Sequence, residues 1–386
     1  MKICFICPCF APAWKYGGLV KVAYELSIHL RERGHYIKVF TTDAKDKKSR
    51  MNESFIPNIN MEVYYCKNLS NYLAWNQRIT ISLSTIWLFK QQIKQFDVVH
   101  IHGYRDFQSV ISYYYCKKYN VPYLIQPHGS VSYINKKRFK ILFDNLIGKK
   151  ILKNAKKVIT LNKSESKLIA SKGVSPDRIE ILPNGINLLS YYPLHKKGIF
   201  KKDLNIPNDV KIILYVGRIN ESKGLDLLII AVSRLLGKNK KILLIIIGED
   251  DGFKSTLQSM IKKFNIERYV HFFGFVSYEK KLDAFADADV FVTPSFYGFP
   301  LTFLESIISG VPIITTNKGD IIEGMHNNYG LITNYDSIAL ECAISKILLD
   351  DNLKEKLQKN AKKESIKYDW DNIIVDLEKI YLKVVG

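Results

Sequence analysis

Two basic side chains stand in one short glycine-containing segment near the middle of the sequence, VGRINESKG (216–224). The segment overlaps the end of an apolar run, KIILYVGR (211–218), and precedes a helical pattern. Gly217 therefore ends a predicted strand, and Arg218 and Lys223 lie in the loop that leads into the helix. Fixed cations beside the free N–H groups of a helix N-terminus can bind a diphosphate. A solvated loop that carries two surface bases is the alternative.

A second candidate segment is TPSFYGFPLTFLESIISGVPIITTNKGDIIE (293–323). A predicted strand ends near its start, Gly298 allows close approach of the backbone, and a helix begins near Pro300. Glu305 lies about one turn into that helix, where both carboxylate oxygens could accept hydrogen bonds from two vicinal hydroxyls. A surface carboxylate is the alternative. Because the surrounding helix is apolar, an unpaired charge would be costly, and we expect a partner for Glu305.

Two further candidates lie in the first half of the chain. Gly17 and Gly18 follow the first apolar run and precede the first helical pattern, so their loop could face a phosphate. His128, in QPHGS (126–130), follows a predicted strand. Its imidazole could donate a hydrogen bond to a sugar hydroxyl or a phosphate oxygen, and a titration near neutrality would let it shuttle a proton. A histidine with a purely structural role is the alternative.

The elements that must position these residues follow a repeated pattern, in which short apolar runs alternate with amphipathic helical patterns. Continuous Val/Ile/Leu runs are typical of strands buried on both faces, and strands that alternate with helices indicate parallel sheets. We expect strands at residues 1–7, 36–43, 98–103, 121–129, 157–162, 178–185, 211–218, 241–249, 271–276, 289–295 and 311–317.

This number of strands exceeds what one sheet of this kind holds, so the sequence predicts two α/β domains. The break falls in PNGINLLSYYP (183–193), where turn-forming residues gather. We therefore expect domains at residues 1–185 and 186–369. A last helical pattern, at 368–385, either caps the second domain or crosses back to the first.

Composition excludes several classes of protein. The 386 residues are 47% apolar and 24% charged, as in a folded chain rather than a disordered one. The apolar stretch at 79–89 is too short for a bilayer-spanning helix, which needs ~20 residues, and the N-terminal run is too short for a signal peptide. A cytoplasmic location is the expectation. Cys4, Cys7 and Cys9 form a cluster without a second Cys/His pair at metal-site spacing, so we expect reduced thiols and no metal.

The net charge of +20 is unevenly distributed. Residues 1–185 hold 30 Lys and Arg against 12 Asp and Glu, whereas residues 186–386 hold 27 against 25. The excess in the first half attracts an anionic partner: nucleic acid, an acidic membrane leaflet or a phosphate-bearing substrate. Its densest part, 134–157, has nine basic residues against Asp144 alone, interleaved with apolar ones. This pattern predicts a basic surface able to lie on an anionic membrane, or a core-packing helix with a solvated lysine face.

Together and in this order, the motifs resemble glycosyltransferase family 4, nucleotide-sugar-dependent enzymes of the GT-B type. The resemblance covers nearly the whole chain and is carried by GG (17–18), VVHIHGY (98–104), PHG (127–129), ILPNGI (181–186), VGR (216–218), KG (223–224), GE (248–249), FFGFV (272–276), PS (294–295), GFP (298–300), LES (304–306) and GVPII (310–314). It implies two Rossmann-like domains that face a central cleft, with the C-terminal helix (370–386) crossing back to the first. It also implies transfer of a hexosyl group from a nucleotide diphosphate sugar to a glycan or lipid-linked glycan, with retention of configuration and no bound metal, in cell-surface polysaccharide synthesis.

The same resemblance implies a role for each candidate residue. Arg218 and Lys223 neutralise the donor diphosphate, Glu305 binds the ribose, and His128 lies near the transferred sugar. The remaining donor contacts fall on Gly17, Gly18, Gly217, Gly274, Phe275, Val276, Tyr297, Gly298, Phe299, Pro300 and Leu301, with the base against residues 274–276.

One position departs from the family pattern. The family has two glutamates separated by seven residues, of which Glu305 is the second, but Tyr297 occupies the place of the first. The preceding PS–G spacing is also one residue short. A phenol is not ionised at neutral pH and cannot accept hydrogen bonds as a carboxylate does. Either backbone N–H groups of residues 298–301 hold the donor sugar instead, or the activity is altered.

Other interpretations compete with this one. The basic half could indicate a nucleic-acid-binding protein, but no finger, helix-turn-helix or aromatic stacking platform is recognisable, so nucleic acid is not an expected partner. Tyr297 alone would fit a non-catalytic scaffold. The acidic pair in DAD (287–289) resembles the metal site of another glycosyltransferase architecture. Because it lies between a predicted helix and a strand, we favour a structural role for both aspartates.

Overall fold

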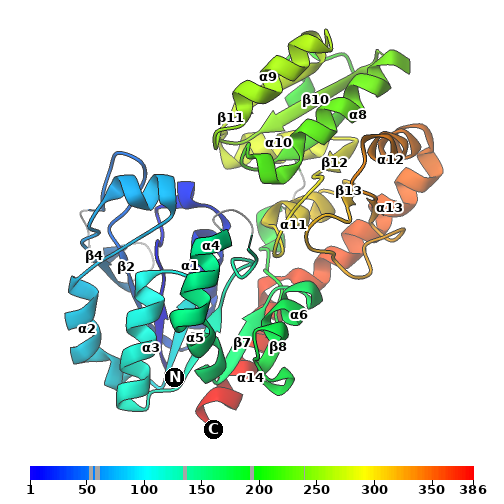
Figure 1. Ribbon diagram of the computed structural model, residues 1–386. Coiled ribbons are helices and arrows are strands. Elements are labelled where there is room, and N and C mark those ends of the chain that lie inside the picture. Colours follow the sequence, from blue (N-terminus) through cyan, green and yellow to red (C-terminus); the bar gives the residue numbers. More distant parts are fainter. Residues whose placement is uncertain (52–54, 57–60, 134–136, 192–194, 239) are drawn as a thin grey trace. The chain divides into compact units, whose positions relative to one another are not determined.

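The chain forms two units, each built around its own sheet (Figure 1). Unit 1 comprises Met1–Asn184 and Trp370–Gly386, and unit 2 comprises Gly185–Asp369. The computed structural model describes residues 1–51, 55–56, 61–133, 137–191, 195–238 and 240–386. The end of the predicted interdomain segment, 192–193, and the start of the predicted basic surface, 134–136, lie outside the described residues.

Unit 1 contains an eight-stranded sheet in the order β3-β4-β2-β1-β5-β6-β7-β8. Neighbouring strands are parallel, except that β3 and β4 are antiparallel. The central strands are buried on both faces, which explains their continuous apolar sequences. The strands are β1 (Lys2–Ile6), β2 (Tyr36–Thr42), β3 (Phe55–Ile56), β4 (Met61–Cys66), β5 (Val98–His102), β6 (Tyr123–Gln126), β7 (Lys157–Thr160) and β8 (Ile179–Ile181).

Two helices of unit 1, α3 and α6, begin at polar side chains that cap them. Asp106 accepts a hydrogen bond from the N–H of Ser109 at the start of α3, and Asn162 accepts one from the N–H of Glu165 at the start of α6. The helices are α1 (Gly18–Glu32), α2 (Ser84–Gln92), α3 (Phe107–Tyr119), α4 (Lys137–Phe143), α5 (Lys149–Asn154), α6 (Lys163–Ser171) and α14 (Trp370–Val385), with short turns η1 (Trp14–Tyr16), η3 (Leu73–Gln77), η4 (Ile93–Gln95), η5 (Asp144–Gly148) and η6 (Pro176–Arg178).

The last helix, α14, belongs to unit 1 although it follows unit 2 in the sequence. Its red ribbon lies among elements of unit 1 in Figure 1. Its buried face, which includes Leu377 and Tyr381, packs against α1 and β5. Glu378 accepts from Arg33 at 2.7 Å and from His35 at 2.8 Å. Of the two positions predicted for this helix, the structure shows the return to the first domain.

Unit 2 contains a six-stranded parallel sheet in the order β11-β10-β9-β12-β13-β14. Helix α8 packs against α9 and α12, and α10 packs against α7 and α11. The strands are β9 (Lys211–Val216), β10 (Ile242–Ile247), β11 (Val270–Gly274), β12 (Val290–Val292), β13 (Ile313–Thr316) and β14 (Gly330–Thr333). The helices are α7 (Ile199–Asp203), α8 (Leu225–Lys238), α9 (Lys254–Lys263), α10 (Tyr278–Asp287), α11 (Leu301–Ile308), α12 (Ser337–Leu349) and α13 (Asp351–Ser365), with short turns η7 (Leu188–Tyr191), η8 (Glu221–Lys223), η9 (Glu267–Tyr269) and η10 (Ile366–Tyr368).

The predicted α/β class is confirmed, but three strands were not predicted: β3, β4 and β14. β4 alternates polar and apolar residues, so it lacks the continuous apolar run on which the prediction depended. β14 begins at Gly330, which in the sequence resembles a turn residue. The glycine is required there because a Cβ would lie 2.4 Å from the carbonyl oxygen of Ile313 on the neighbouring strand.

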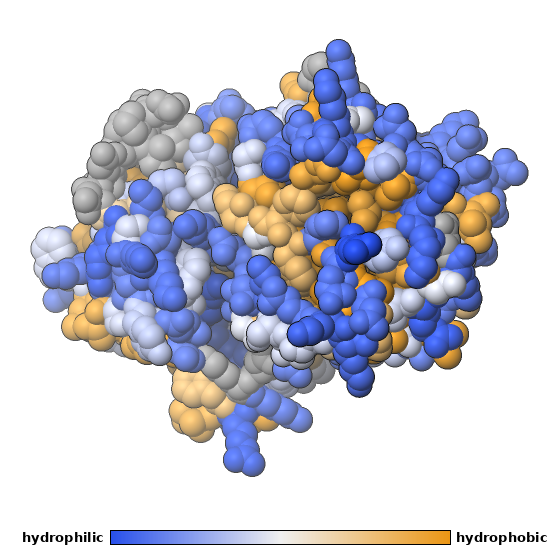
Figure 2. Space-filling view, turned by 90° about the horizontal axis from the view of Figure 1, so that it is seen from above, coloured by the Kyte–Doolittle hydropathy of each residue, from blue (hydrophilic) through white to orange (hydrophobic). Residues whose placement is uncertain are grey.

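Hydrophobic side chains are exposed in patches between hydrophilic ones on the face shown in Figure 2. Apolar atoms contribute much of the surface of any folded protein, so this distribution alone marks no binding site. No helix in the described part of the chain combines the length and apolar character needed to cross a bilayer. The N-terminal thiols of Cys4, Cys7 and Cys9 are buried, and burial raises the pKa of each, that of Cys9 to about 12.

Candidate functional site

The strand order of unit 2 reverses direction between β9 and β12, which are neighbours in the sheet. In open α/β sheets, ligands bind beyond the carboxyl ends of the strands at such a switch point. The loop after β9 (217–224) and the loop after β12 (293–300) both begin there. They are in contact, because a Cβ on Gly224 would lie 3.0 Å from the Cβ of Pro294. The two strongest candidate segments of the sequence therefore meet.

Backbone hydrogen bonds tie the loop after β9 to the ends of the next two strands. The N–H of Gly217 donates to the carbonyl of Ile247 at 2.9 Å, and the N–H of Gly248 donates to that of Gly274 at 2.8 Å. Gly248 has φ 147°, and a Cβ there would lie 1.9 Å from the carbonyl oxygen of Gly217, so no other residue fits. These hydrogen bonds place Gly274 at the same edge of the sheet as Gly217 and Gly248. Phe275, which follows it, is 62% exposed, and Val276 is half-buried.

The two predicted cations in this loop have different surroundings. Arg218 is half-exposed, and its Nη1 lies 3.2 Å from Oδ2 of Asp251. Lys223, the last residue of η8, has no ion pair with any carboxylate among the described residues. Burial, and secondly the charge of Arg218, lowers the pKa of Lys223 to about 8. An anion bound between the two cations would remove this repulsion, as the predicted diphosphate site requires.

Glu305 has the partner that its apolar surroundings required. Its side chain is buried on α11, and Oε1 accepts a hydrogen bond from Nζ of Lys281 at 2.5 Å. Oε2 is buried too, and no hydrogen-bond partner for it exists among the described residues. Lys281 uses one acceptor site of Oε1, and the acceptor sites of Oε2 are unused among the described residues. The predicted role of both oxygens in binding two hydroxyls stays a prediction.

The segment between β12 and α11 contains the position that departs from the family pattern. Tyr297 is half-buried there. The N–H of Gly298 donates to Oδ2 of Asp320 at 2.6 Å. The predicted substitute for the missing glutamate, a set of backbone N–H groups at 298–301, thus loses its first member to Asp320. Helix α11 begins at Leu301, whose N–H lies in the first turn and has no intrahelical acceptor, whereas the N–H of Phe303 donates to the carbonyl of Pro300 at 3.0 Å.

Two predicted contact residues in this segment have a packing or capping role. Phe299 is buried, and its ring lies 5.2 Å from that of Tyr368 between centroids. Pro300 is the residue that caps α11, and it makes no side-chain hydrogen bond there. The structure therefore gives Phe299 a place in the core of unit 2, whereas Pro300 sets the start of the helix that carries Glu305.

In unit 1 the corresponding switch point lies between β1 and β5. Gly17, with φ 102°, precedes α1, and Gly18 is the first residue of that helix. Both glycines are exposed, so the first amides of α1 are accessible. The arrangement fits the predicted approach of a phosphate.

His128 follows β6 in the left-handed backbone conformation, with φ 53°. Its Nε2 lies 3.0 Å from Nδ1 of His102, and the next residue, Gly129, donates its N–H to Oε1 of Glu165 at 2.8 Å. Burial lowers the pKa of His128 to about 3. The prediction that it titrates near neutrality is therefore wrong, and its ring is neutral at pH 7.

Both halves of the chain match described protein families. Residues 16–188 match Glycosyltransferase Family 4, and residues 196–364 match Glycosyl transferases group 1. The chain is a group 1 glycosyltransferase of family 4. The two matched ranges contain every residue for which the sequence predicts a contact with the donor.

Curated relatives agree with the family assignment, and solved structures share the fold. An uncharacterized glycosyltransferase of Methanocaldococcus jannaschii is 31% identical over 59% of this chain and 61% of its own length. An N,N'-diacetylbacillosaminyl-diphospho-undecaprenol alpha-1,3-N-acetylgalactosaminyltransferase of Campylobacter jejuni is 28% identical over 62% of this chain and 64% of its own length. The structure of HepE from Anabaena, in complex with UDP and glucose, matches 98% of this chain and 99% of its own with a TM-score of 0.77, at 16% identity. Among the first curated relatives, the match spans 53–61% of their length.

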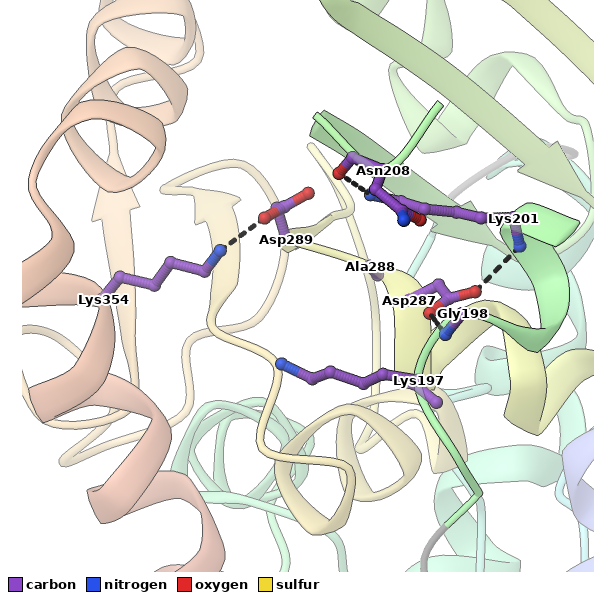
Figure 3. Close-up of a pocket in the computed structure, with 9 residues that line it drawn as sticks. Lys197, Gly198, Lys201, Asn208, Asp287, Ala288, Asp289 and Lys354 are labelled. Carbon is purple, nitrogen blue, oxygen red and sulfur yellow. Dashed lines mark hydrogen bonds and ion pairs between the residues drawn. The ribbon is translucent and has the colours of Figure 1, made fainter. Parts of the chain in front are cut away.

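The two carboxylates of DAD (287–289) contact backbone N–H groups and lysine (Figure 3). Asp287 accepts from the backbone N–H groups of Gly198 and Lys201, and Asp289 accepts from that of Ile212 and pairs with Lys354. The two carboxylates line a hollow of about 340 Å³ with their hydrogen bonds directed to the backbone and to lysine. No group of three potential metal ligands occurs among the described residues.

Three contacts near the candidate residues were not predicted from the sequence. Lys281 pairs with Glu305, and His102 contacts His128. The third is a buried ionic cluster around Asp144, whose carboxylate accepts from Arg105, Lys172, Tyr104 and Tyr133 at 2.7–2.9 Å. Only the histidine left a signal: HIH at 100–102 places two histidines on one face of a predicted strand.

Arg105 connects that ionic cluster to the loop that carries His128. Its guanidinium donates to the carbonyls of Ser130 and Val131 at 2.5 and 2.8 Å, in addition to binding both oxygens of Asp144. The N–H of Gly129 donates to Glu165, so the loop after His128 is fixed by Glu165 at Gly129 and by Arg105 at Ser130 and Val131. These contacts explain how His128 is kept in a left-handed conformation, which is strained for a residue with a Cβ.

Proposed function

We propose that this chain transfers a hexosyl group from a nucleoside diphosphate sugar to a hydroxyl of a glycan or lipid-linked glycan. The observation that carries the proposal is Lys223, a partly buried cation beside Arg218 with no carboxylate partner among the described residues. Two neighbouring cations at a switch point match the charge of a diphosphate. The family assignment and the UDP held by HepE support a nucleotide sugar as the donor.

The proposed reaction breaks the bond between the anomeric carbon of the sugar and a diphosphate oxygen. The departing diphosphate gains negative charge as this bond lengthens. Arg218, Lys223 and the free amides at the start of α11 stabilise that charge more in the transition state than in the bound substrate, which accelerates the step. The acceptor hydroxyl attacks from the same face, and its proton passes to the departing phosphate oxygen, so configuration is retained. Side-chain cations take the part that a divalent metal plays in other transferases.

A binding panel tests this proposal directly. We expect UDP-, GDP- or ADP-sugars to raise the thermal midpoint of unfolding, because a ligand that binds only the folded state stabilises it. Glu305→Leu should weaken this response, since Oε2 is the free acceptor for a ribose hydroxyl, whereas Glu279→Leu on the exposed start of α10 should not. The response should persist in EDTA. If none of the nucleotide sugars shifts the midpoint, or if the shift requires a divalent metal, the corresponding part of the proposal is wrong.

We further propose that α4 and η5 bind an anionic membrane surface, near a lipid-linked acceptor. Helix α4 has no buried residue, and Phe139, Leu142 and Leu146 are each more than half exposed. Their spacing of three and four residues places them on one helical face. Core packing, the alternative for this segment, applies to α5, where Ile151 and Leu152 are fully buried. The name of the Campylobacter relative, which acts on an undecaprenol diphosphate, supports a lipid-linked acceptor.

Replacing both Phe139 and Leu142 with serine is expected to weaken binding to anionic vesicles by roughly tenfold or more, because their apolar side chains no longer enter the interface. Vesicle sedimentation at low salt measures this. Leu349→Ser is the matched control, since Leu349 is 76% exposed on α12 of unit 2. Wild-type protein should dissociate from anionic vesicles as the salt concentration rises, because salt screens the attraction between charges. Equal partitioning of the wild type onto neutral and anionic vesicles would contradict the proposal.

A further inference from the structure

Three histidines of unit 1 form a continuous row, here called the histidine ladder (His100, His102 and His128). His100 and His102 lie two residues apart on β5, so their side chains point to the same face of the sheet, and both are fully buried. Their rings stack with centroids 3.9 Å apart. The ring of His102 also stacks on that of His128, at 5.3 Å, and their nitrogens Nδ1 and Nε2 share a hydrogen bond of 3.0 Å.

The far end of the ladder is fixed by the returning helix. Nδ1 of His100 lies 2.7 Å from the hydroxyl of Tyr381 on α14, which is itself fully buried. Phe5 on β1 closes the side of the row, with its ring centroid 4.6 Å from that of His102. The ladder therefore has no freedom to rotate, and it ends at His128, the one member that is partly exposed.

The hydrogen bond between His102 and His128 leaves one ring nitrogen of His128 for a ligand. Nε2 of His128 is occupied by His102, so Nδ1 is the only ring nitrogen that can contact a bound molecule. Burial lowers the pKa of all three histidines, so the rings are neutral and each carries one proton. The position of the proton on His102 then decides whether Nδ1 of His128 donates or accepts.

The surroundings of His102 decide between the two arrangements. Its Nε2 is buried and has no hydrogen-bond partner in the described part of the chain. If His128 donated to His102, the single proton of His102 would lie on Nε2 as a buried N–H without an acceptor. Such orphaned donors are rarer in proteins than under-satisfied acceptors. The arrangement with the proton on Nδ1 of His102 leaves only an unused lone pair at Nε2.

We infer that His102 is a positioning residue that donates from Nδ1 to Nε2 of His128 and thereby makes Nδ1–H of His128 a fixed hydrogen-bond donor toward the ligand. The ligand atom that it fits is an oxygen acceptor: a hydroxyl of the transferred sugar or a phosphate oxygen of the donor. The inference about the ligand rests on the proposed function, whereas the proton positions do not. His128 then orients and polarises the donor, and it does not move a proton.

Nitrogen NMR of the full-length protein labelled with ¹⁵N-histidine tests the proton positions without any substrate. We expect His128 to carry its proton on Nδ1, and this tautomer should not change between pH 6 and pH 8. His102→Phe keeps a ring in the stack but removes the donor, so His128 should become a mixture of both tautomers. His102→Asn retains an N–H close to the place of Nδ1 and should restore the single tautomer. His271→Phe, at an exposed position on β11 of unit 2, should leave the His128 signals unchanged.

Binding measurements then connect the ladder to the ligand. His102→Phe should weaken binding of the nucleotide sugar by roughly two- to tenfold, as for one lost hydrogen bond, and His102→Asn should recover it. A proton on Nε2 of His128 in the wild type overturns the inference even if His102→Phe fails to fold, as does an unchanged His128 tautomer in a folded His102→Phe protein. If the expected tautomer is found but no nucleotide sugar binds, the ladder stands and the proposed function fails.

Discussion

Replacing Lys223 with alanine is expected to lower turnover by roughly 10²–10³-fold, about 3–4 kcal/mol of barrier, as for the loss of one group that stabilises developing charge. Lys223 lies in the loop after β9 beside Arg218, and it forms no ion pair with a carboxylate among the described residues. Its charge is therefore available to the departing diphosphate. The measurement is the initial rate of sugar transfer, or of slow donor hydrolysis without an acceptor.

Lys197→Ala is the matched control for this variant, because Lys197 is an exposed lysine that lines the hollow of Figure 3 and should not affect turnover. The pH dependence gives a second control. Since the pKa of Lys223 is about 8, its ammonium loses its proton above that pH, and binding of UDP by the wild type should weaken there. Lys223→Ala should lack this step. Turnover at the wild-type level in the variant would remove Lys223 from the mechanism.

Replacing Asp144 with asparagine is expected to destabilise the protein by about 3–5 kcal/mol, because it leaves buried cations without their counter-charge. The carboxylate of Asp144 is fully buried, and the charged groups of Arg105 and Lys172 that it binds are nearly so. Unfolding in urea measures the change. Asp209→Asn is the control, because the pair of Asp209 with Lys241 is exposed to solvent and its loss should change the free energy of unfolding little.

The effect of Asp144→Asn should depend on pH. Although burial opposes ionisation, the hydrogen bonds from Arg105, Lys172 and Tyr133 lower the pKa of Asp144 to about 2. In the unfolded chain an aspartate titrates near ~3.9. The carboxylate therefore contributes its full stability above pH ~5, and this contribution is lost as pH falls toward 2. The difference between wild type and variant should shrink over that range, and a constant difference would contradict the assigned cluster.

The fold was largely predictable because its central strands are buried on both faces. Continuous apolar runs such as KIILYVGR (211–218) and KILLIIIGE (241–249) are typical of central strands in a parallel sheet. β4 and β14 were not predictable by the same rule, since β4 is covered less evenly and β14 depends on a glycine that accommodates a neighbouring carbonyl. To predict β4 and β14 as strands, one must know which strand lies beside each of them, and the local sequence does not contain that tertiary contact.

The candidate site was predictable as a set of strand-exit loops, but not in its electrostatics. The contact of the loops after β9 and β12 follows from the strand order, which the alternation of elements does not specify. The pairing of Lys281 with Glu305 joins residues on two helices, and the neutral state of His128 depends on burial that no local pattern reveals.

The return of α14 to unit 1 makes unit 2 an insertion within the first unit's chain. The segments that enter and leave unit 2 run side by side, because the N–H of Ile186 donates to the carbonyl of Tyr368 at 2.8 Å and Ile186 pairs with Asp369. An insertion whose two ends are adjacent can be excised or exchanged as one module. Joining Asn184 to Trp370 through a short linker would keep Tyr381 beneath the ladder, whereas truncation after Asn184 would leave His100 without its hydroxyl partner.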